Sequence, residues 1–420
     1  MILFEKIKKY LLYAYVFYVV YTPVINTGPL FDKYAVLYGL LVVVLLPYVL
    51  RRDVSVLRIL SRKSIVILML SVFISSLYFT AVQIANNVEI GSFMDLRIIQ
   101  NNIINVLIVH AAVIVDMLQK RGFTRRQAFE LLLKFGALQG VICLLGLVIP
   151  YFKELAVSFY EAAGGANPFV IEARIYGISS DYTFGTPIYH GLLAGVAVYY
   201  SVRDRIYRYY PLILLTLLAA FLNGRTGIVL FLVVAVLSII FLYIKKREKR
   251  KILIALGSIA VAVTVVMSFI GHVSPSTQQF IARFVEDTHN LLFEQELTGN
   301  YQILIEDSLN IPARDGAILF GEGLRVYDAS AEHVVGFRSD IGYVNDMYMG
   351  GIVFMALLYV SMFYFLLADG KTDRILFVLI VLVILLANFK GEIFRSSIVM
   401  FLIVYLKLLT VSFKQEKRVS

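Results

Sequence analysis

Two arginines of this sequence precede a glycine at the same spacing. Arg174 precedes Gly185 and Arg325 precedes Gly336, each with an Arg-x10-Gly pattern. Both pairs lie in the only two long polar breaks of a chain that otherwise consists of apolar runs. A guanidinium keeps its positive charge at all ordinary pH values and presents a planar fork of N–H donors to carboxylate or phosphate oxygens. The two pairs therefore predict sites for anions, and the chemistry of the anion decides the function.

A third arginine, Arg225, lies in a short segment between two apolar runs. The segment reads Asn223-Gly224-Arg225-Thr226-Gly227. Its two glycines allow the backbone to approach a ligand closely. A cation at the surface of an apolar region is costly unless a partner balances it. We therefore expect Arg225 to bind an anionic ligand; the alternative is an ion pair with a carboxylate of the chain.

The elements that position these residues are expected to be membrane-spanning helices. Of the 420 residues, 60% are hydrophobic and 16% are charged, whereas a soluble domain has about 25% charged residues. We predict an all-α, polytopic integral membrane protein that forms a single membrane domain over residues 1–420, with about twelve spans. The predicted spans are 10–26, 34–50, 64–84, 98–117, 128–149, 186–201, 209–223, 227–244, 252–271, 342–367, 375–389 and 396–413.

Basic residues concentrate in every second connection between the predicted spans. Most of the 39 lysines and arginines fall near the two termini and in alternate loops. Because basic loops face the cytoplasm, both termini are predicted to be cytoplasmic. The opposite side then carries two long loops, 151–185 after span five and 272–341 after span nine. The net charge of +10 follows from this topology and from attraction to anionic lipids, so no nucleic-acid partner is expected.

The cations on the outward side are mostly arginines. They are Arg97, Arg174, Arg225, Arg283, Arg314, Arg325, Arg338 and Arg395. A guanidinium binds two phosphate oxygens at once, whereas a lysine ammonium is a compact point charge. The bias towards arginine favours a site for a diphosphate or an acidic sugar. The alternative is that each of these arginines pairs with one of the outward carboxylates.

The first long loop ends in a helix start. Gly185 is followed by Thr186-Pro187, which is a typical cap followed by a proline in the first turn. We therefore expect a helix to begin just after the glycine. Its free N–H groups would face outward, where they could bind a phosphate.

The second long loop contains further polar candidates. His333 could act as a general base on a sugar hydroxyl, or it could be a solvated loop residue. Arg338 and Asp340 follow it in the sequence. The sequence has no metal-ligand spacing of the common kinds and no nucleotide-binding loop, so we expect chemistry without a metal or cofactor.

These motifs resemble those of the Wzy-type O-antigen polymerases, members of the O-antigen ligase and polymerase superfamily. About twelve spans and an Arg-x10-Gly pattern in both long loops are similar to that family. The Asn223–Gly227 segment resembles its Ser-Arg-Thr/Ser-Gly turn, with Gly224 in place of the serine. Gly321–Gly323, followed by Ser339–Tyr343 running into Gly350–Gly351, is similar to its Gly-x-Gly and Asp-x-Gly-Tyr segments.

The resemblance implies a GT-C-like enzyme in the bacterial inner membrane. Such a metal-independent glycosyltransferase works at the outer face of this membrane. It transfers a growing glycan from undecaprenyl diphosphate onto a new lipid-linked repeat unit, so the lipid-linked glycan is both donor and acceptor. The product would be O-antigen, capsule or exopolysaccharide, and a flippase and a chain-length regulator are the expected protein partners.

The same resemblance implies roles for the candidate residues. Arg174, Arg225 and Arg325 would hold the diphosphate or glycan anions and stabilise charge on the leaving group. His333 would be the catalytic base by its place near that of the related ligases, although the residues after it differ from the ligase spacing. The remaining candidates for substrate binding are Arg338, Asp340, Gly185, Gly336 and Arg314.

Two other functions agree with parts of this pattern. An O-antigen ligase, or another transferase of lipid-linked glycans, would have a similar membrane domain and similar loops. A flippase or transporter would be expected to have inverted repeats and polar groups near the middle of the bilayer. The polar residues concentrate in the outward loops instead, which favours a transferase.

Overall fold

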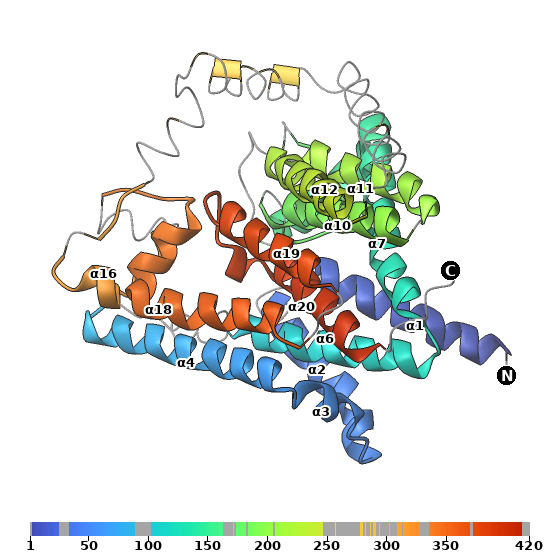
Figure 1. Cartoon of the computed structure of the whole chain (residues 1–420), viewed down its shortest axis with the longest axis horizontal. Coiled ribbons are helices and arrows are strands. Elements are labelled where there is room, and N and C mark those ends of the chain that lie inside the picture. Colours follow the sequence, from blue (N-terminus) through green and yellow to red (C-terminus); the bar gives the residue numbers. More distant parts are fainter. Residues whose placement is uncertain are drawn as a thin grey trace. The chain divides into compact units, whose positions relative to one another are not determined.

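The computed structural model describes residues 2–24, 33–88, 102–162, 174–181, 184–204, 206–246, 309–312, 314–326, 336–369 and 373–413, with isolated positions (171 and several between 257 and 302). Over these residues the chain consists of helices joined by turns and loops, without a strand (Figure 1). The prediction of an all-α fold is therefore confirmed for this part of the chain.

Four helices in the described residues are long and apolar enough to cross a membrane. They are α4 (Lys63–Ala85), α6 (Ile103–Lys120), α7 (Arg125–Val148) and α18 (Gly342–Leu367). Their length and composition are those of helices that span the hydrocarbon core of a bilayer. These helices indicate a membrane-embedded protein.

The described residues form further helices, and most of these lie close to the predicted spans. They are α1 (Ile2–Tyr21), α2 (Lys33–Leu50), α3 (Ser55–Leu60), α8 (Pro150–Ala162), α10 (Gly185–Asp204), η3 (Tyr207–Tyr209), α11 (Tyr210–Asn223), α12 (Arg225–Lys246), α16 (Ala317–Phe320), α19 (Arg374–Ala387), η7 (Ile393–Arg395) and α20 (Ser397–Ser412). A helix occupies every predicted span except 252–271, which lies almost entirely outside the described residues. Because several of these helices are short, the figure of about twelve spans stays a prediction.

Two helices fall within the predicted loops. α8 (Pro150–Ala162) occupies the first part of the 151–185 loop, and the short α16 (Ala317–Phe320) lies within the 272–341 loop. Proline at the first position of α8 has the backbone angle of a helix and no N–H that would remain unbonded. The loops are therefore partly helical, which the sequence reading did not include for these residues.

The chain forms two compact units. Unit 1 comprises Met1–Leu60, Val106–Val273 and Ser396–Ser420, and unit 2 comprises Ser61–Asn105 and Ser274–Arg395. Each unit contains apolar helices from distant parts of the sequence. The single membrane domain over residues 1–420 stays a prediction.

α10 forms the centre of unit 1. It packs against α11, α12 and α20, and its side chains from Gly185 to Val202 are all buried. A helix whose whole circumference is buried must be apolar on every side, and the sequence of α10 is apolar except at its ends and at His190. Figure 1 shows α10, α11 and α12 lying side by side.

Glycines allow α10 and α12 to approach closely. A Cβ atom on Gly191 of α10 would lie 1.9 Å from the carbonyl oxygen of Gly227 in α12. A Cβ atom on Gly227 would in turn lie 2.1 Å from the carbonyl oxygen of Pro187. The two backbones therefore touch where α12 begins, next to the first turns of α10.

α18, the main helix of unit 2, is interrupted at a glycine. Gly351 has φ 64° and ψ −162°, a conformation that only glycine adopts without strain. The interruption accommodates α16, because a Cβ atom on Gly351 would lie 2.4 Å from the backbone of Leu319. α18 also packs along α4 (Figure 1).

The loop after α16 is held against the same point of α18. The N–H of Glu322 donates to the carbonyl oxygen of Tyr348 at 2.7 Å. Gly321 and Gly323 on either side have φ values of +79° and +75°. These glycines allow the turn that carries the chain from α16 towards Arg325.

The close crossing of α10 and α12 can be tested by replacing a glycine with alanine at the crossing and, as a control, in another helix. Gly191→Ala should lower the free energy of unfolding by about 1–3 kcal/mol, because the added methyl group forces two backbones apart. Gly39→Ala is the matched control, because Gly39 lies in α2 with nothing within 4 Å of its Cβ position. This second substitution should be neutral or stabilising by about 0.5–1 kcal/mol.

Cys143 provides the measurement. It is the only cysteine of the sequence, lies in α7 and is buried. A thiol-reactive fluorophore added to the detergent-solubilised protein therefore reports unfolding as the temperature rises. Equal melting temperatures for Gly191→Ala and the wild type would contradict the close crossing.

Candidate functional site

In unit 2 the loop that carries Arg325 lies beside the segment that carries Arg338 and Asp340. The N–H of Ser339 donates to the carbonyl oxygen of Val326 at 3.2 Å. This bond joins the residue after Arg325 to the residue between Arg338 and Asp340. The structure therefore brings together the backbone of three predicted site residues of the second long loop.

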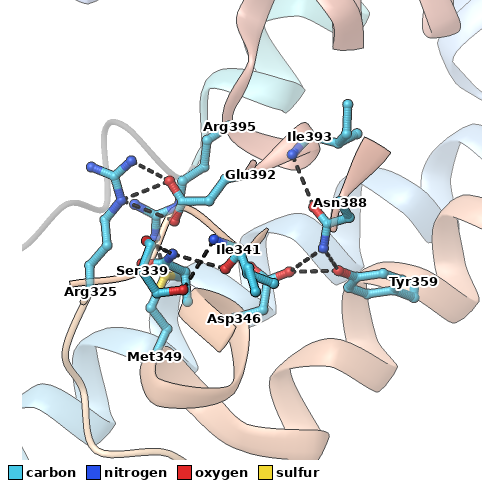
Figure 2. Close-up of polar contacts among 11 residues, drawn as sticks. Arg325, Ser339, Ile341, Asp346, Met349, Tyr359, Asn388, Glu392, Ile393 and Arg395 are labelled. Carbon is cyan, nitrogen blue, oxygen red and sulfur yellow. Dashed lines mark hydrogen bonds and ion pairs between the residues drawn. The ribbon is translucent and has the colours of Figure 1, made fainter. Parts of the chain in front are cut away.

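Arg325 binds a carboxylate that the sequence reading did not assign to the site. Its Nε donates to both oxygens of Glu392, at 3.0 and 2.8 Å, and its Nη2 also contacts Oε2 (Figure 2). A second arginine, Arg395, places its Nε 3.4 Å from Glu392 Oε1. The side chain of Glu392 is only 6% exposed. Two guanidinium groups thus converge on one buried carboxylate.

A second network holds the turn that contains Glu392. The Asn388 side chain donates to Asp346 Oδ2 at 3.3 Å and to the hydroxyl of Tyr359, which itself donates to Asp346 Oδ2 at 2.6 Å. The side-chain oxygen of Asn388 accepts from the N–H of Ile393 at 3.0 Å (Figure 2). One amide thereby fixes the turn between α19 and η7 to α18.

The remaining candidates of this loop are more exposed. Arg338 is exposed, and Asp340 is 59% exposed with its Oδ2 3.6 Å from Nζ of Lys390. Gly336 is exposed and has φ +78°, so its backbone conformation explains the glycine. These residues can meet a large ligand from solution, but an exposed ion pair such as Asp340–Lys390 contributes little stability.

Arg314 contacts the residue that follows the last residue of α4. Its Nη1 donates to Asn86 Oδ1 at 3.0 Å. Burial raises the pKa of Glu322, and the charge of Arg314 opposes this increase. Arg314 therefore interacts with the loop that leads to Arg325.

In unit 1 the segment that follows Arg174 is bound tightly between helices. The N–H of Ile175 donates to the carbonyl oxygen of Leu222, at the end of α11, at 3.0 Å. The Gln139 side chain bonds both backbone groups of Ile178 at 2.7 Å each. These bonds replace a regular backbone ladder, so an irregular segment is buried without loss of its hydrogen bonds.

The charge of Arg174 interacts with two tyrosines of the same loop. Burial lowers the pKa of Arg174 below its ordinary value, and Tyr176 and Tyr160 oppose the change. Burial also raises the pKa of Tyr176, so this hydroxyl stays neutral at physiological pH. Because the ordinary pKa of arginine exceeds about 12, Arg174 keeps its positive charge.

The start of α10 differs in detail from the sequence reading. α10 begins at Gly185, and the N–H of Thr186 donates to the carbonyl oxygen of Asp181 at 3.0 Å. The Thr186 hydroxyl donates to the same oxygen. The prediction of free N–H groups is therefore wrong for Thr186. Its backbone and side chain close the preceding turn and do not remain available to a ligand.

Gly185 is a glycine for a different reason from Gly336. A Cβ atom on Gly185 would lie 2.3 Å from Ser396 Oγ and 2.6 Å from Asp181 Oδ2. The Ser396 hydroxyl donates to Asp181 Oδ2 at 3.1 Å. Both glycines follow an arginine at the same spacing, but the structure requires them for different reasons. Gly185 has no room for a side chain, whereas Gly336 has a left-handed backbone angle.

The segment Asn223–Gly227 forms a sharp turn between two helices. α11 ends at Asn223 and α12 begins at Arg225. Gly227 packs on the backbone of Pro187, in the first turn of α10. The Ile175–Leu222 bond places the backbone of Arg174 next to the same turn.

The described residues thus supply arginines in both units. Arg174 and the backbone of Arg225 belong to unit 1, while Arg325, Arg338 and Arg395 belong to unit 2. The side chain of Arg225 lies outside the described residues, as do Arg97, Arg283 and His333.

Sequence reading missed Glu392 and Arg395 as members of the site. The sequence predicts Arg395 only as one of the outward cations. It does not show that Glu392 pairs with Arg325, because the two residues are far apart in the chain and no local pattern links them. The available signal was a polar stretch, Asn388–Arg395, in a short connection between two apolar runs. Charged residues in such a short turn are candidates for a buried ion pair.

Comparison of the chain with known proteins found no relative. Neither the family models, the curated proteins nor the solved structures give a match. Within the described residues no group of histidine, cysteine, aspartate and glutamate side chains could hold a metal ion. The functional assignment therefore depends on the arginines and on the groups that position them.

The importance of Asn388 can be measured directly. Asn388→Ala removes the donor to Asp346 and the acceptor for Ile393, so it should lower the free energy of unfolding by about 2–4 kcal/mol. Lys390→Ala in the same turn is the control and should change it by less than about 0.5 kcal/mol. Thermal unfolding in detergent measures both, and equal effects would rule out the proposed anchoring.

Proposed function

We propose that the protein polymerises undecaprenyl-diphosphate-linked oligosaccharide repeat units into O-antigen, capsule or exopolysaccharide. In this proposal it works at the outer face of the bacterial inner membrane, with both termini in the cytoplasm. The growing chain is transferred to a fresh lipid-linked repeat unit. A flippase would deliver the repeat units, and a chain-length regulator would limit the product.

The arrangement at the start of α12 is the observation that carries the proposal. Arg225 opens α12, whose first turn packs on the first turn of α10. Arg174 lies one residue from the bond that joins its segment to Leu222. Permanent positive charges and the N-terminal end of a helix together favour a phosphate-bearing ligand.

Unit 2 adds groups suited to the same chemistry. Arg325 and Arg395 converge on one carboxylate, in the geometry by which guanidinium groups bind oxyanions. Arg338 and Asp340 are exposed on the adjoining segment, where the acceptor glycan could contact them. The arginines would stabilise the negative charge that develops on the leaving diphosphate.

The proposed reaction is a glycosyl transfer. A hydroxyl of the acceptor sugar attacks the anomeric carbon of the donor, and the bond from this carbon to the diphosphate oxygen breaks. The lipid diphosphate leaves with the electron pair, and the hydroxyl proton passes to a base, for which His333 is the candidate. The leaving group is already activated, so the step needs neither a metal nor a cofactor.

Arg225 provides the test of this function. Arg225→Ala should abolish polymer, because losing one charge that stabilises the leaving group lowers the rate by roughly 10²–10³-fold. Arg225→Lys should restore little, because an ammonium cannot make the two parallel bonds of a guanidinium. The measurement is a gel of cell-surface polysaccharide from a deletion strain complemented with each variant.

The same gel separates the alternatives. Lys134→Ala is the control, because Lys134 is exposed and forms a local ion pair with Glu130 at 3.0 Å; it should leave chain length normal. The deletion strain should carry single repeat units. Polymer that accumulates on undecaprenyl diphosphate would indicate a ligase, and normal chain length in correctly inserted Arg225→Ala would refute the site.

A further inference from the structure

The ion cluster around Glu392 holds two guanidinium groups that a ligand can reach. Arg325 and Arg395 converge on Glu392, whose side chain is 6% exposed. The buried carboxyl group of Asp346 also interacts electrostatically with Arg395 and Glu392. Both arginines are partly accessible, with 20% and 17% of their side chains exposed.

The carboxylate occupies the position that an oxyanion of a ligand would take. Its two oxygens accept from Nε and Nη2 of Arg325 and lie beside Nε of Arg395. A phosphate group presents oxygens to a guanidinium in the same bidentate manner. Glu392 and a phosphate would thus compete for the same donors.

Arg395 also contacts a weaker partner. Its Nη2 approaches the thioether sulfur of Met349. A thioether is a weak hydrogen-bond acceptor, and a charged guanidinium bonds far more strongly to an anionic oxygen. An incoming phosphate would therefore offer this donor a better partner.

The backbone around Glu392 does not depend on its side chain. Ile393 is held by Asn388, and Asn388 is held by Asp346 and Tyr359. The N–H of Arg395 donates to the carbonyl oxygen of Glu392 at 3.1 Å. The carboxylate can leave the two arginines while the turn stays in place.

From these observations we propose that Glu392 is an exchangeable internal anion. It neutralises part of the charge of Arg325 and Arg395 in the resting protein, and one phosphate of a lipid diphosphate displaces it on binding. The identification of the ligand as a lipid diphosphate rests on the proposed function. The exchange keeps both guanidinium groups paired with an anion at every stage. It also opposes retention of the diphosphate after transfer, because Glu392 competes for its place.

The test is a titration of the full-length protein in lipid nanodiscs with inorganic pyrophosphate. Glu392→Gln keeps the shape of the side chain and removes the charge that competes, so pyrophosphate should bind about tenfold tighter than to the wild type. Glu392→Asp keeps the charge and should bind within about threefold of the wild type. Isothermal titration calorimetry measures the three affinities.

Two further variants show where the effect originates. Glu322→Gln removes a negative charge elsewhere in unit 2, near Arg314, and should leave pyrophosphate affinity unchanged. Adding Arg395→Ala to Glu392→Gln should abolish the gain. Equal or weaker binding by Glu392→Gln, or no pyrophosphate binding by any variant, would overturn the proposal.

The test of the proposed function is independent of the test of the exchange. A tenfold gain for Glu392→Gln together with a deletion strain of normal polysaccharide would support the exchange and reject the polymerase. Single repeat units in the deletion strain together with no gain would support the polymerase and reject the exchange.

Discussion

The pairing of Glu392 with Arg325 and Arg395 is the interaction on which the arrangement of unit 2 depends. A buried carboxylate is tolerated only when opposite charge and hydrogen bonds balance it. Glu392 therefore requires that the loop after α16 and the turn after α19 lie together. Because removing one partner of a buried pair costs about 3–5 kcal/mol, these two segments cannot separate unless another anion takes the place of the carboxylate.

Unit 1 meets a different constraint, the close approach of helices. α10 and α12 touch through Gly191 and Gly227, so no side chain separates their backbones. The turn that contains Arg225 consequently lies beside the first turn of α10 and beside the segment after Arg174. Packing by small residues thus determines where the charged groups of this unit lie.

These two arrangements agree with the proposed transfer of a lipid-linked glycan. The reaction needs permanent positive charge for the diphosphate and an open surface for the glycan. The first requirement is met by arginines that apolar helices and buried hydrogen bonds position, and the second by exposed residues such as Arg338 and Asp340.

Apolar runs in the sequence determined the all-helical class and the approximate position of the described helices in the predicted spans, because burial in an apolar surrounding and internal backbone pairing depend on local composition. The helices α3, α8 and α16 lie between those spans and were not predicted. Gly321 lies against the backbone of Gly350, a contact that the sequence alone did not predict. The partner of Arg325, the different reasons for Gly185 and Gly336, and the bonding of Thr186 to Asp181 depended on the tertiary structure. The partner of Arg325 and the crowding at Gly185 involve groups that are far apart in the sequence, and neither the composition nor the spacing of residues identifies such a partner.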